Sequence, residues 1–431
     1  MVRELKHTEV GDIPLNWEIQ TFDETFRILS NNTLSRDNLN NRGGAVRNIH
    51  YGDILTKFPE VLDCREEDIP YVNDSASLSS SIQLLQDGDI VIVDTAEDEA
   101  VGKVIEIQNI GEGKLVAGLH TIPCRVKKGD FAPGWLGYYM NSSLFHDQIL
   151  PYVTGIKVSS ISKSAISDVF ILIPPIEEQE KIVQTLNDIN SLMTAETKVI
   201  SKLMFVKKGC LSKMFPQNGT NIPEMRLPGF TDDWEQRKLG DMMNVTSVKR
   251  IHQSDWTDSG VRFLRARDIV AAAKNEEPDD YLYISKEKYE EYSALSGKVG
   301  VSDLLVTGVG TIGVPYLVRN LEPLYFKDGN IIWFQNSDKI DGKFLFYSFS
   351  AEQIQGFINE SAGIGTVGTY TIESGKKTPI SLPNQIEQAK VGEFFQQLDN
   401  LITLHQCKRD KYASIKKGMI TNLLAGKIRL I

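Results

Sequence analysis

Several groups of residues carry side chains that could do chemistry, and each lacks a partner that the chemistry requires. The glycine-rich stretch Gly308 to Gly313 follows an apolar run, but it has no Lys-Ser/Thr pair and is not a phosphate-binding P-loop. Pro174-Pro175 stands between two isoleucines, where an amino-methyltransferase would need a polar residue to bind an exocyclic amine. Asp279 and the pair Asp341-x-Lys343 are too far apart in the sequence to indicate a nuclease site. We therefore expect no catalytic residue and no enzymatic activity in this chain.

Histidine and cysteine form no metal-binding pattern either. The histidines are scattered outside any His-Glu-x-x-His spacing, and they are His7, His50, His120, His146, His252 and His405. The cysteines also lie far apart, at Cys64, Cys124, Cys210 and Cys407. The sequence thus predicts no metal site and no disulfide framework, and the cysteine usage favours a reducing cytoplasm.

The composition is that of a soluble globular protein. Hydrophobic residues make up 41% of the 431 residues and charged residues 24%, and the length suggests two or three domains. No apolar run is long enough to cross a membrane, and Met1 to Gly11 shows no signal peptide, so we expect no membrane contact. The net charge of −10 argues by itself against nucleic-acid binding, although residues 384–431 carry about +4.

The chain contains an internal duplication. Glu178-Gln179 recurs as Glu387-Gln388, and at the same offset Lys207-Lys208-Gly209 recurs as Lys416-Lys417-Gly418. One constant offset over nearly forty residues indicates two copies of one helical segment. The segments before the two helices have diverged much further, which is typical of two units that bind different targets.

Both repeated segments show apolar residues at alternating steps of four and three, with polar interruptions. In the first segment these positions are Ile182, Leu186, Ile189, Met193, Glu196, Ile200 and Leu203. In the second they are Val391, Phe395, Leu398, Ile402, His405, Arg409 and Tyr412. This spacing predicts a coiled-coil seam. The alternative is that each helix packs on its own globular part.

The remaining segments predict two mixed α/β domains. Apolar strand-like runs are expected at 89–94, 118–126, 169–173, 303–307 and 330–334, and short helices at 135–141 and 343–350. Polar stretches at 30–47, 153–162, 246–260 and 361–370 are expected to be loops that a rigid scaffold presents. The domain limits that follow are 1–174, 175–216 (first helix), 217–382 and 383–431 (second helix and tail).

These features resemble the DNA-specificity subunit of Type I restriction-modification enzymes. The most specific motif is Pro-x-x-x-Glu-Gln-x-Lys-Ile at Pro174 to Ile182, followed by a helix and Lys-Lys-Gly, with a degenerate copy from Pro383 to Gly418. The second copy has Val391 where the first has isoleucine. Other similar pieces are Gly11 to Pro14, Gly155 to Val158, Arg226 to Phe230 and Leu423 to Lys427.

The resemblance implies two target-recognition domains in tandem, each reading one half of a bipartite, asymmetric sequence in double-stranded DNA. The two helices would form an antiparallel coiled coil that spaces the domains and binds two methyltransferase (modification) subunits. Two motor-nuclease (restriction) subunits would complete the complex. S-adenosylmethionine, ATP and Mg²⁺ would then lie on the partners, with no cofactor in this chain. A stand-alone sequence-specific DNA-binding protein and a coiled-coil scaffold remain the alternatives.

Within this resemblance, loop chemistry suggests which residues contact DNA, since arginine suits guanine and asparagine or glutamine suits adenine in the major groove. In the first domain we choose Arg36, Asn38, Asn41, Arg42, Lys157, Ser159 and Ser160. In the second we choose Lys249, Arg250, His252, Gln253, Arg265, Arg267, Thr366 and Tyr370. Four tryptophans are expected in the cores, namely Trp17, Trp135, Trp234 and Trp333.

The antiparallel arrangement also makes a prediction at the middle of the seam. Glu196 and His405 occupy equivalent positions of the two repeats, each near the centre of its helix. Equivalent central positions lie close together in an antiparallel pair. We therefore expect Glu196 to lie within reach of His405 or Arg409, where a polar contact would favour one register.

Overall fold

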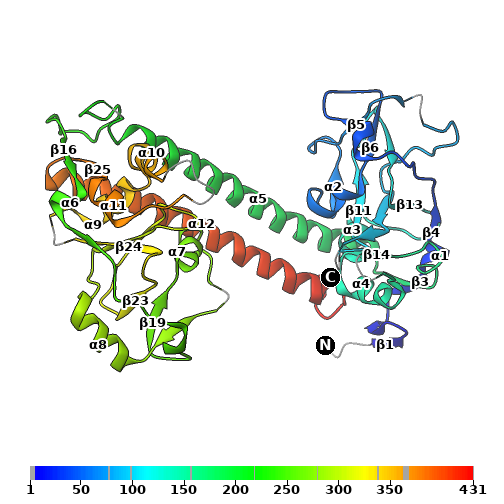
Figure 1. Cartoon of the computed structure of the whole chain (residues 1–431). Coiled ribbons are helices and arrows are strands. Elements are labelled where there is room, and N and C mark those ends of the chain that lie inside the picture. Colours follow the sequence, from blue (N-terminus) through cyan, green and yellow to red (C-terminus); the bar gives the residue numbers. More distant parts are fainter. Residues whose placement is uncertain are drawn as a thin grey trace. The chain divides into compact units, whose positions relative to one another are not determined.

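The computed structural model describes residues 5–75, 78–97, 100–155, 158–217, 219–278, 280–336, 339–362 and 368–430. The chain divides into two compact units (Figure 1). Unit 1 consists of Met1–Ala195 together with Lys408–Ile431, and unit 2 is Glu196–Cys407. Each unit therefore combines one globular part with segments of two long helices, α5 (Ile176–Lys213) and α12 (Gln385–Leu423).

Unit 1 contains a five-stranded sheet whose central strand is buried on both faces. The strand order is β4 (Phe26–Ile28), β13 (Thr121–Val126), β9 (Ile90–Val93), β11 (Val104–Gln108) and β7 (Val61–Asp63). In β9, Ile90 and Ile92 face one hydrophobic core, while Val91 and Val93 face a second, because successive side chains point to opposite faces. A strand that is apolar at every position is thus explained by cores on both of its sides.

A second sheet of unit 1 carries a parallel strand pair. Its order is β12 (Lys114–Ala117), β6 (Val46–Ile49), β8 (Tyr71–Val72) and β5 (Leu39–Asn40), with β12 parallel to β6. The helices of the globular part are α1 (Phe22–Thr25), α2 (Tyr51–Thr56), α3 (Trp135–Met140) and α4 (Ser143–Ile149). Three strand pairs complete unit 1: β1 (Leu5–Thr8) with β2 (Gly11–Pro14), β3 (Glu18–Thr21) with β15 (Phe170–Ile173), and β10 (Thr95–Ala96) with β14 (Ser159–Ser160).

Unit 2 repeats this plan with two four-stranded sheets. The first has the order β17 (Asn244–Thr246), β24 (Ile331–Gln335), β21 (Leu304–Thr307) and β22 (Pro315–Leu317). The second has the order β18 (Trp256–Thr257), β20 (Leu282–Ile284), β19 (Val261–Leu264) and β23 (Leu324–Phe326). Strand β21 is also buried on both faces, since Leu304 and Val306 belong to one core and Leu305 to another.

The other elements of unit 2 are short helices and one strand pair. The helices are α6 (Leu239–Met242), α7 (Ala266–Ala273), α8 (Lys286–Ser296), α9 (Gly342–Ser348), α10 (Glu352–Ser361) and α11 (Ile372–Lys377). The strands β16 (Glu235–Lys238) and β25 (Pro379–Leu382) pair antiparallel. The predicted strands correspond to β9, β13, β15, β21 and β24, and the predicted short helices to α3 and α9, so these predictions are confirmed.

The helix ends belong to the cores of the globular parts. In unit 1, Ile182 and Leu186 of α5 lie in one core with Leu423 and Leu424 at the end of α12. In unit 2, Cys210 of α5 lies in a core with Val391 and Phe395 of α12. The helix ends therefore pack on globular parts, which was the alternative to a coiled-coil seam. The four-part division by residue number stays a prediction.

Inside unit 2 the two helices run antiparallel. The ammonium group of Lys207 lies 2.6 Å from a carboxylate oxygen of Asp399. Glu196 is nearer to the start of α5 than Lys207 is. It contacts His405, which is nearer to the end of α12 than Asp399 is. Residue numbers thus rise along one helix where they fall along the other. Pairing of the helices over their whole length stays a prediction.

Candidate nucleic-acid interface

The repeated glutamates are buried, and each binds an arginine from the segment that follows the other helix. In unit 1, Glu178 is fully buried and accepts hydrogen bonds from Arg429, with Nη2 to Oε2 at 2.6 Å. The indole N–H of Trp17 donates to the same carboxylate at 3.0 Å. In unit 2, Glu387 is fully buried and receives two bonds of 2.7 Å from Arg226. Such bidentate pairs fix both distance and orientation.

The repeated glutamines attach the helix starts to the globular parts. Gln179 accepts a hydrogen bond from the backbone N–H of Ala132 at 2.9 Å and donates to the carbonyl of Pro174 at 2.8 Å. Gln388 accepts from the N–H of Asp341 at 3.1 Å and donates to the carbonyl of Pro383 at 2.8 Å. The Glu-Gln motif is therefore a structural joint and is not available to a ligand.

The duplication extends to a tyrosine and lysine beside the helices. In unit 2, the Tyr347 hydroxyl donates to Asp399 at 2.6 Å, and Lys207 lies 5.5 Å from the centre of the Tyr347 ring. In unit 1, Lys416 lies 5.7 Å from the centre of the Tyr138 ring and pairs with Glu60 at 2.7 Å. In both units, a lysine of one long helix thus lies near the ring of a tyrosine from the globular part.

The predicted central contact is confirmed for one of its two candidate partners. Nδ1 of His405 and a carboxylate oxygen of Glu196 are in hydrogen-bond contact within unit 2, and both side chains are mostly buried. Arg409 lies in unit 1, where it pairs with the neighbouring Asp410 at 2.8 Å. The polar residues that interrupt the apolar seam, Glu196 and His405, therefore pair with each other.

Glu196→Leu is expected to leave the thermal stability unchanged or to raise it, by no more than about 2 kcal/mol in unfolding free energy. The reason is that an apolar residue in a seam avoids the cost of burying a charged carboxylate. Thermal unfolding of the full chain would measure this. A variant that is strongly destabilised but keeps the correct spacing would contradict a role of the pair in register.

The carboxyl ends of two parallel strands form an edge of unit 1 that gathers polar and aromatic side chains. Strands β6 and β12 are in register at Ile49 and Ala117, so the residues that follow them lie at the same end. We call this the α2 edge, and it comprises Arg36, His50, Tyr51, Asp53, Asp94 and His120. Asp53, in the first turn of α2, is buried and binds the Arg36 guanidinium at 2.5 Å.

His50 begins helix α2. Its Nδ1 accepts a hydrogen bond from the backbone N–H of Gly52 at 3.1 Å. Burial lowers the pKa of His50, which agrees with a neutral ring, because only an unprotonated nitrogen can accept this bond. His50 is therefore a helix cap.

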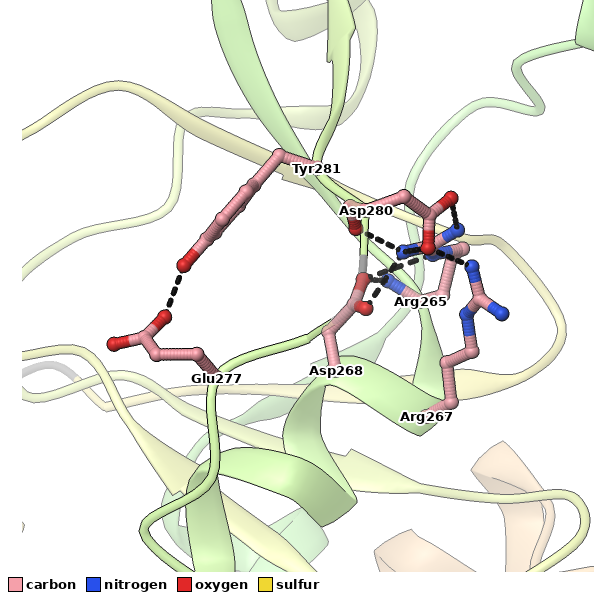
Figure 2. Close-up of polar contacts among 6 residues, drawn as sticks. All are labelled: Arg265, Arg267, Asp268, Glu277, Asp280 and Tyr281. Atoms are coloured by element: carbon pink, nitrogen blue, oxygen red, sulfur yellow. Dashed lines mark hydrogen bonds and ion pairs between the residues drawn. The ribbon is translucent and has the colours of Figure 1, made fainter. Parts of the chain in front are cut away.

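Unit 2 has the corresponding edge, which we call the α7 edge and which comprises Arg250, Arg265, Arg267, Asp268, Asp280 and Asp328. Strands β19 and β23 are parallel and in register at Leu264 and Phe326. Figure 2 shows Arg265 and Arg267 converging on Asp280, with Asp268 below Arg265. Arg250 pairs with Asp328 at 2.9 Å.

Backbone hydrogen bonds show that the two edges share one scaffold. The N–H of Gly118 donates to the carbonyl of Ile49 at 2.9 Å, and in unit 2 the N–H of Lys327 donates to that of Leu264 at 2.8 Å. The N–H of Asp94 donates to the carbonyl of His120 at 3.2 Å, as the N–H of Gly308 does to that of Asn330 at 2.7 Å. The scaffold is common, but the side chains differ.

Comparisons with known proteins identify this architecture. Residues 231–412 match the family described as the Type I restriction modification DNA specificity domain. The resemblance recognised in the sequence is thereby confirmed.

Relatives extend the similarity to the whole chain. A protein of Methanocaldococcus jannaschii named as the specificity subunit of the type I restriction enzyme MjaX is 25% identical, over 99% of this chain and 96% of its own. The MjaVIII specificity subunit of the same organism is 27% identical, over 64% of this chain and 66% of its own. The crystal structure of a Type I S subunit from M. genitalium shares the fold, with a TM-score of 0.55, 13% identity and coverage of 98% and 99%.

The structure places several of the chosen residues of unit 1 beside the α2 edge. Arg36 and Asn38 form a one-turn 3₁₀ helix, and Asn41 and Arg42 are exposed in the segment that follows it. Ser159 and Ser160 lie in β14, which pairs with β10 directly after Asp94. Lys157 lies outside the described residues. Whether these side chains contact DNA stays a prediction.

Unit 2 exposes Lys249, Arg250, His252, Gln253 and Arg267. His252 caps a 3₁₀ helix that begins at Gln253 and precedes β18, as the 3₁₀ helix of Arg36 precedes β5. The two polar loops therefore occupy the same topological position. Thr366 lies outside the described residues.

Two of the residues chosen in unit 2 need correction. Tyr370 is 2% exposed and its hydroxyl lies 2.5 Å from that of Thr378, so the side chain is a core residue that DNA cannot reach. Arg265 is bound by Asp268 and Asp280, and its side chain is only 15% exposed. Burial alone would lower the pKa of Arg265, but its bonds to the two aspartates raise it. Arg265 therefore shapes the α7 edge, because all three of its guanidinium nitrogens already donate to Asp268 or Asp280.

The tryptophan prediction is confirmed, since Trp17, Trp135, Trp234 and Trp333 are all buried. The sequence reasoning missed Tyr51, His120 and Asp94 of the α2 edge. They come from three separate segments, and only the fold brings them together. An indication was available in the polar residues that directly follow apolar runs, at the ends of strands.

Proposed function

We propose that this protein is the DNA sequence-specificity subunit of a Type I restriction-modification complex. Each unit reads one half of a bipartite, asymmetric target, and the chain itself catalyses nothing. The observation that carries the proposal is the pair of edges, which repeat one backbone scaffold with different polar side chains. A common scaffold with different hydrogen-bonding groups is what two different half-sites require.

The exposed positive charges at the two edges suit a DNA backbone better than the negative net charge of the whole chain does. The cations Lys249, Arg250 and Arg267 are exposed at the α7 edge or in the loop beside it. In unit 1, Arg36 is exposed at the α2 edge and Arg42 in the loop beside it. Phosphate contacts need such cations. The net charge of −10 implies that partner subunits supply further positive charge and that the acidic surface faces away from DNA.

Exposed apolar side chains of the long helices are the proposed docking surface for two methyltransferase subunits. In unit 2, α5 exposes Met204 at 55% and Phe205 at 79%, and α12 exposes Leu404 at 51%. Apolar groups so exposed on a soluble protein typically mark an interface. S-adenosylmethionine would lie on these partners, and ATP and Mg²⁺ on two restriction subunits.

The proposed setting is the cytoplasm, where DNA and the partners are found. Among the helices of the described residues, none is apolar enough over a sufficient length to cross a bilayer. Within the same residues, no group of three His, Cys, Asp or Glu is placed to hold a metal ion.

The function is tested by expressing the chain with the methyltransferase of its own system and mapping N6-methyladenine across the genome. We expect one bipartite motif, methylated only when this chain is present. Tight sequence-specific binding by the isolated chain would favour a stand-alone regulator. Binding of the methyltransferase without any DNA dependence would favour a scaffold.

Phe205→Glu is expected to weaken binding of the methyltransferase at least about tenfold, because a charge replaces an exposed anchor at the proposed interface. Titration calorimetry with the purified partner would measure the affinity. Leu295→Glu is the matched control, since Leu295 is also exposed, at 68%, but lies at the end of α8. Equal losses in the two variants would contradict docking on the helices.

A further inference from the structure

The α2 edge holds a cluster of aromatic and histidine side chains, Tyr51, His50 and His120, beside the acidic side chain of Asp94. The Tyr51 ring stacks on His50 with 4.8 Å between centroids and meets His120 edge-on at 5.2 Å. Nδ1 of His120 lies 3.5 Å from a carboxylate oxygen of Asp94. The His120 side chain is 41% exposed, so the cluster opens to the surface.

Backbone hydrogen bonds hold this cluster beside Ser159 and Ser160, two of the predicted DNA contacts. The N–H of Asp94 donates to the carbonyl of His120 at 3.2 Å, and the N–H of Ile161 donates to the carbonyl of Asp94 at 2.9 Å. The Asp94 carboxylate also accepts from the hydroxyl of Thr95 at 2.8 Å. Three segments of unit 1, including the one that carries Ser159 and Ser160, therefore meet at Asp94.

His120 is held in a backbone conformation that a non-glycine residue rarely adopts. Its φ of 57° lies in the left-handed region, where a side chain is strained. A polar contact as exposed as that between His120 and Asp94 adds little stability in return. Strain of this kind at a surface position is more often kept for a functional side chain.

We infer that His120 and Tyr51 read bases in the half-site of unit 1, and that Asp94 is the positioning residue for the His120 ring. The inference rests on the proposed function and deepens it. With Nδ1 turned to Asp94, the other ring nitrogen, Nε2, points away from that carboxylate. Imidazole and phenol groups can hydrogen-bond the edges of bases in the major groove, so the cluster offers specific contacts where Arg36 offers a phosphate contact.

The corresponding positions of unit 2 support a reading role. The backbone bond that links Asp94 to His120 links Gly308 to Asn330 in unit 2, so both side chains of the pair differ. Arg265 follows β19 there as His50 follows β6, and Ala266 stands where Tyr51 does. The cluster is thus absent from the matching place in unit 2, as expected if the half-sites differ in sequence.

The test uses the full chain with the methyltransferase of its own system, in the variants His120→Ala, Tyr51→Phe and Asp94→Asn. Bound sequences are selected from a random DNA library, and N6-methyladenine is mapped in cells. For His120→Ala we expect the preference at one or two positions of a single half-site to fall about tenfold or more, while the other half-site is unchanged. Asp94→Asn is expected to relax the same positions less strongly.

His7→Ala is the matched control, because His7 also pairs with an aspartate, Asp12, at 2.9 Å on the surface of unit 1, but in the β1–β2 pair. Unchanged base preferences in His120→Ala would overturn the inference and leave the proposed function standing. A uniform weakening on all sequences would also overturn it, because that is the mark of a phosphate contact. Absence of any bipartite motif in the unchanged protein would instead defeat the proposed function. Unfolding temperatures of all variants exclude misfolding as the cause.

Discussion

Replacing Arg226 by alanine is expected to destabilise unit 2 by about 3–5 kcal/mol. Glu387 is fully buried, and both of its carboxylate oxygens accept hydrogen bonds of 2.7 Å from Arg226. Removing the arginine leaves a buried carboxylate without its countercharge, and the group must either stay unsolvated or draw water into the core. Chemical unfolding of the full chain, followed by tryptophan fluorescence, would measure the loss.

A nearby exposed pair provides the control. Lys213 pairs with Glu224 in the same unit, with side chains that are 47% and 66% exposed. Because surface pairs contribute little, Lys213→Ala should cost less than about 1 kcal/mol. The double change Arg226→Leu with Glu387→Leu should recover much of the stability, since no charge then stays buried. Equal effects of Arg226→Ala and Lys213→Ala would mean that burial does not set the strength of the Glu387 pair.

The helices and the strands buried on both faces were predictable because local pattern decides them. A constant offset over nearly forty residues located α5 and α12. Strand β9 reads Ile-Val-Ile-Val, and such a run is apolar throughout only when a core lies on each side. By contrast, β6 contains Arg47 and Asn48, whose polarity hid a strand from the pattern.

Contacts between distant segments were not predictable from one sequence. Arg429 and Glu178 are separated by 251 positions, and nothing local to either residue indicates the other. Glu196 and His405 are separated by 209 positions, but the internal repeat supplied the missing geometry, because it relates equivalent residues. A long-range contact was thus predicted only where sequence symmetry could replace knowledge of the fold.

The surroundings of single side chains in the candidate site were not predictable from the sequence either. Tyr370 and Arg265 have the residue types of DNA contacts, yet the first lies in a core and the second is bound by two aspartates. Burial and acidic partners are decided by tertiary packing, which loop composition does not report. Arg36 and Asp53 show the reverse case, in which an exposed arginine is tethered by a buried acid and still faces solvent.

Exchanging residues 1–170 for those of a homologous specificity subunit is expected to change one half of the DNA target and leave the other half as it was. The exchanged segment contains the α2 edge, while the α7 edge lies in unit 2. Methylome sequencing of cells that carry the chimera and its methyltransferase would show the new motif. The reciprocal exchange of residues 235–380 should change only the other half.

The structure also sets a condition for this exchange to work. Trp17 donates its indole N–H to Glu178, and Glu178 in turn binds Arg429, so residues on both sides of the junction and near the end of the chain meet at one buried carboxylate. A donor segment with tryptophan at this position should fold on the unchanged helix start, whereas a donor without it should lose methylation of the whole target. A folded chimera in which both half-sites change would show that the two units do not read DNA independently.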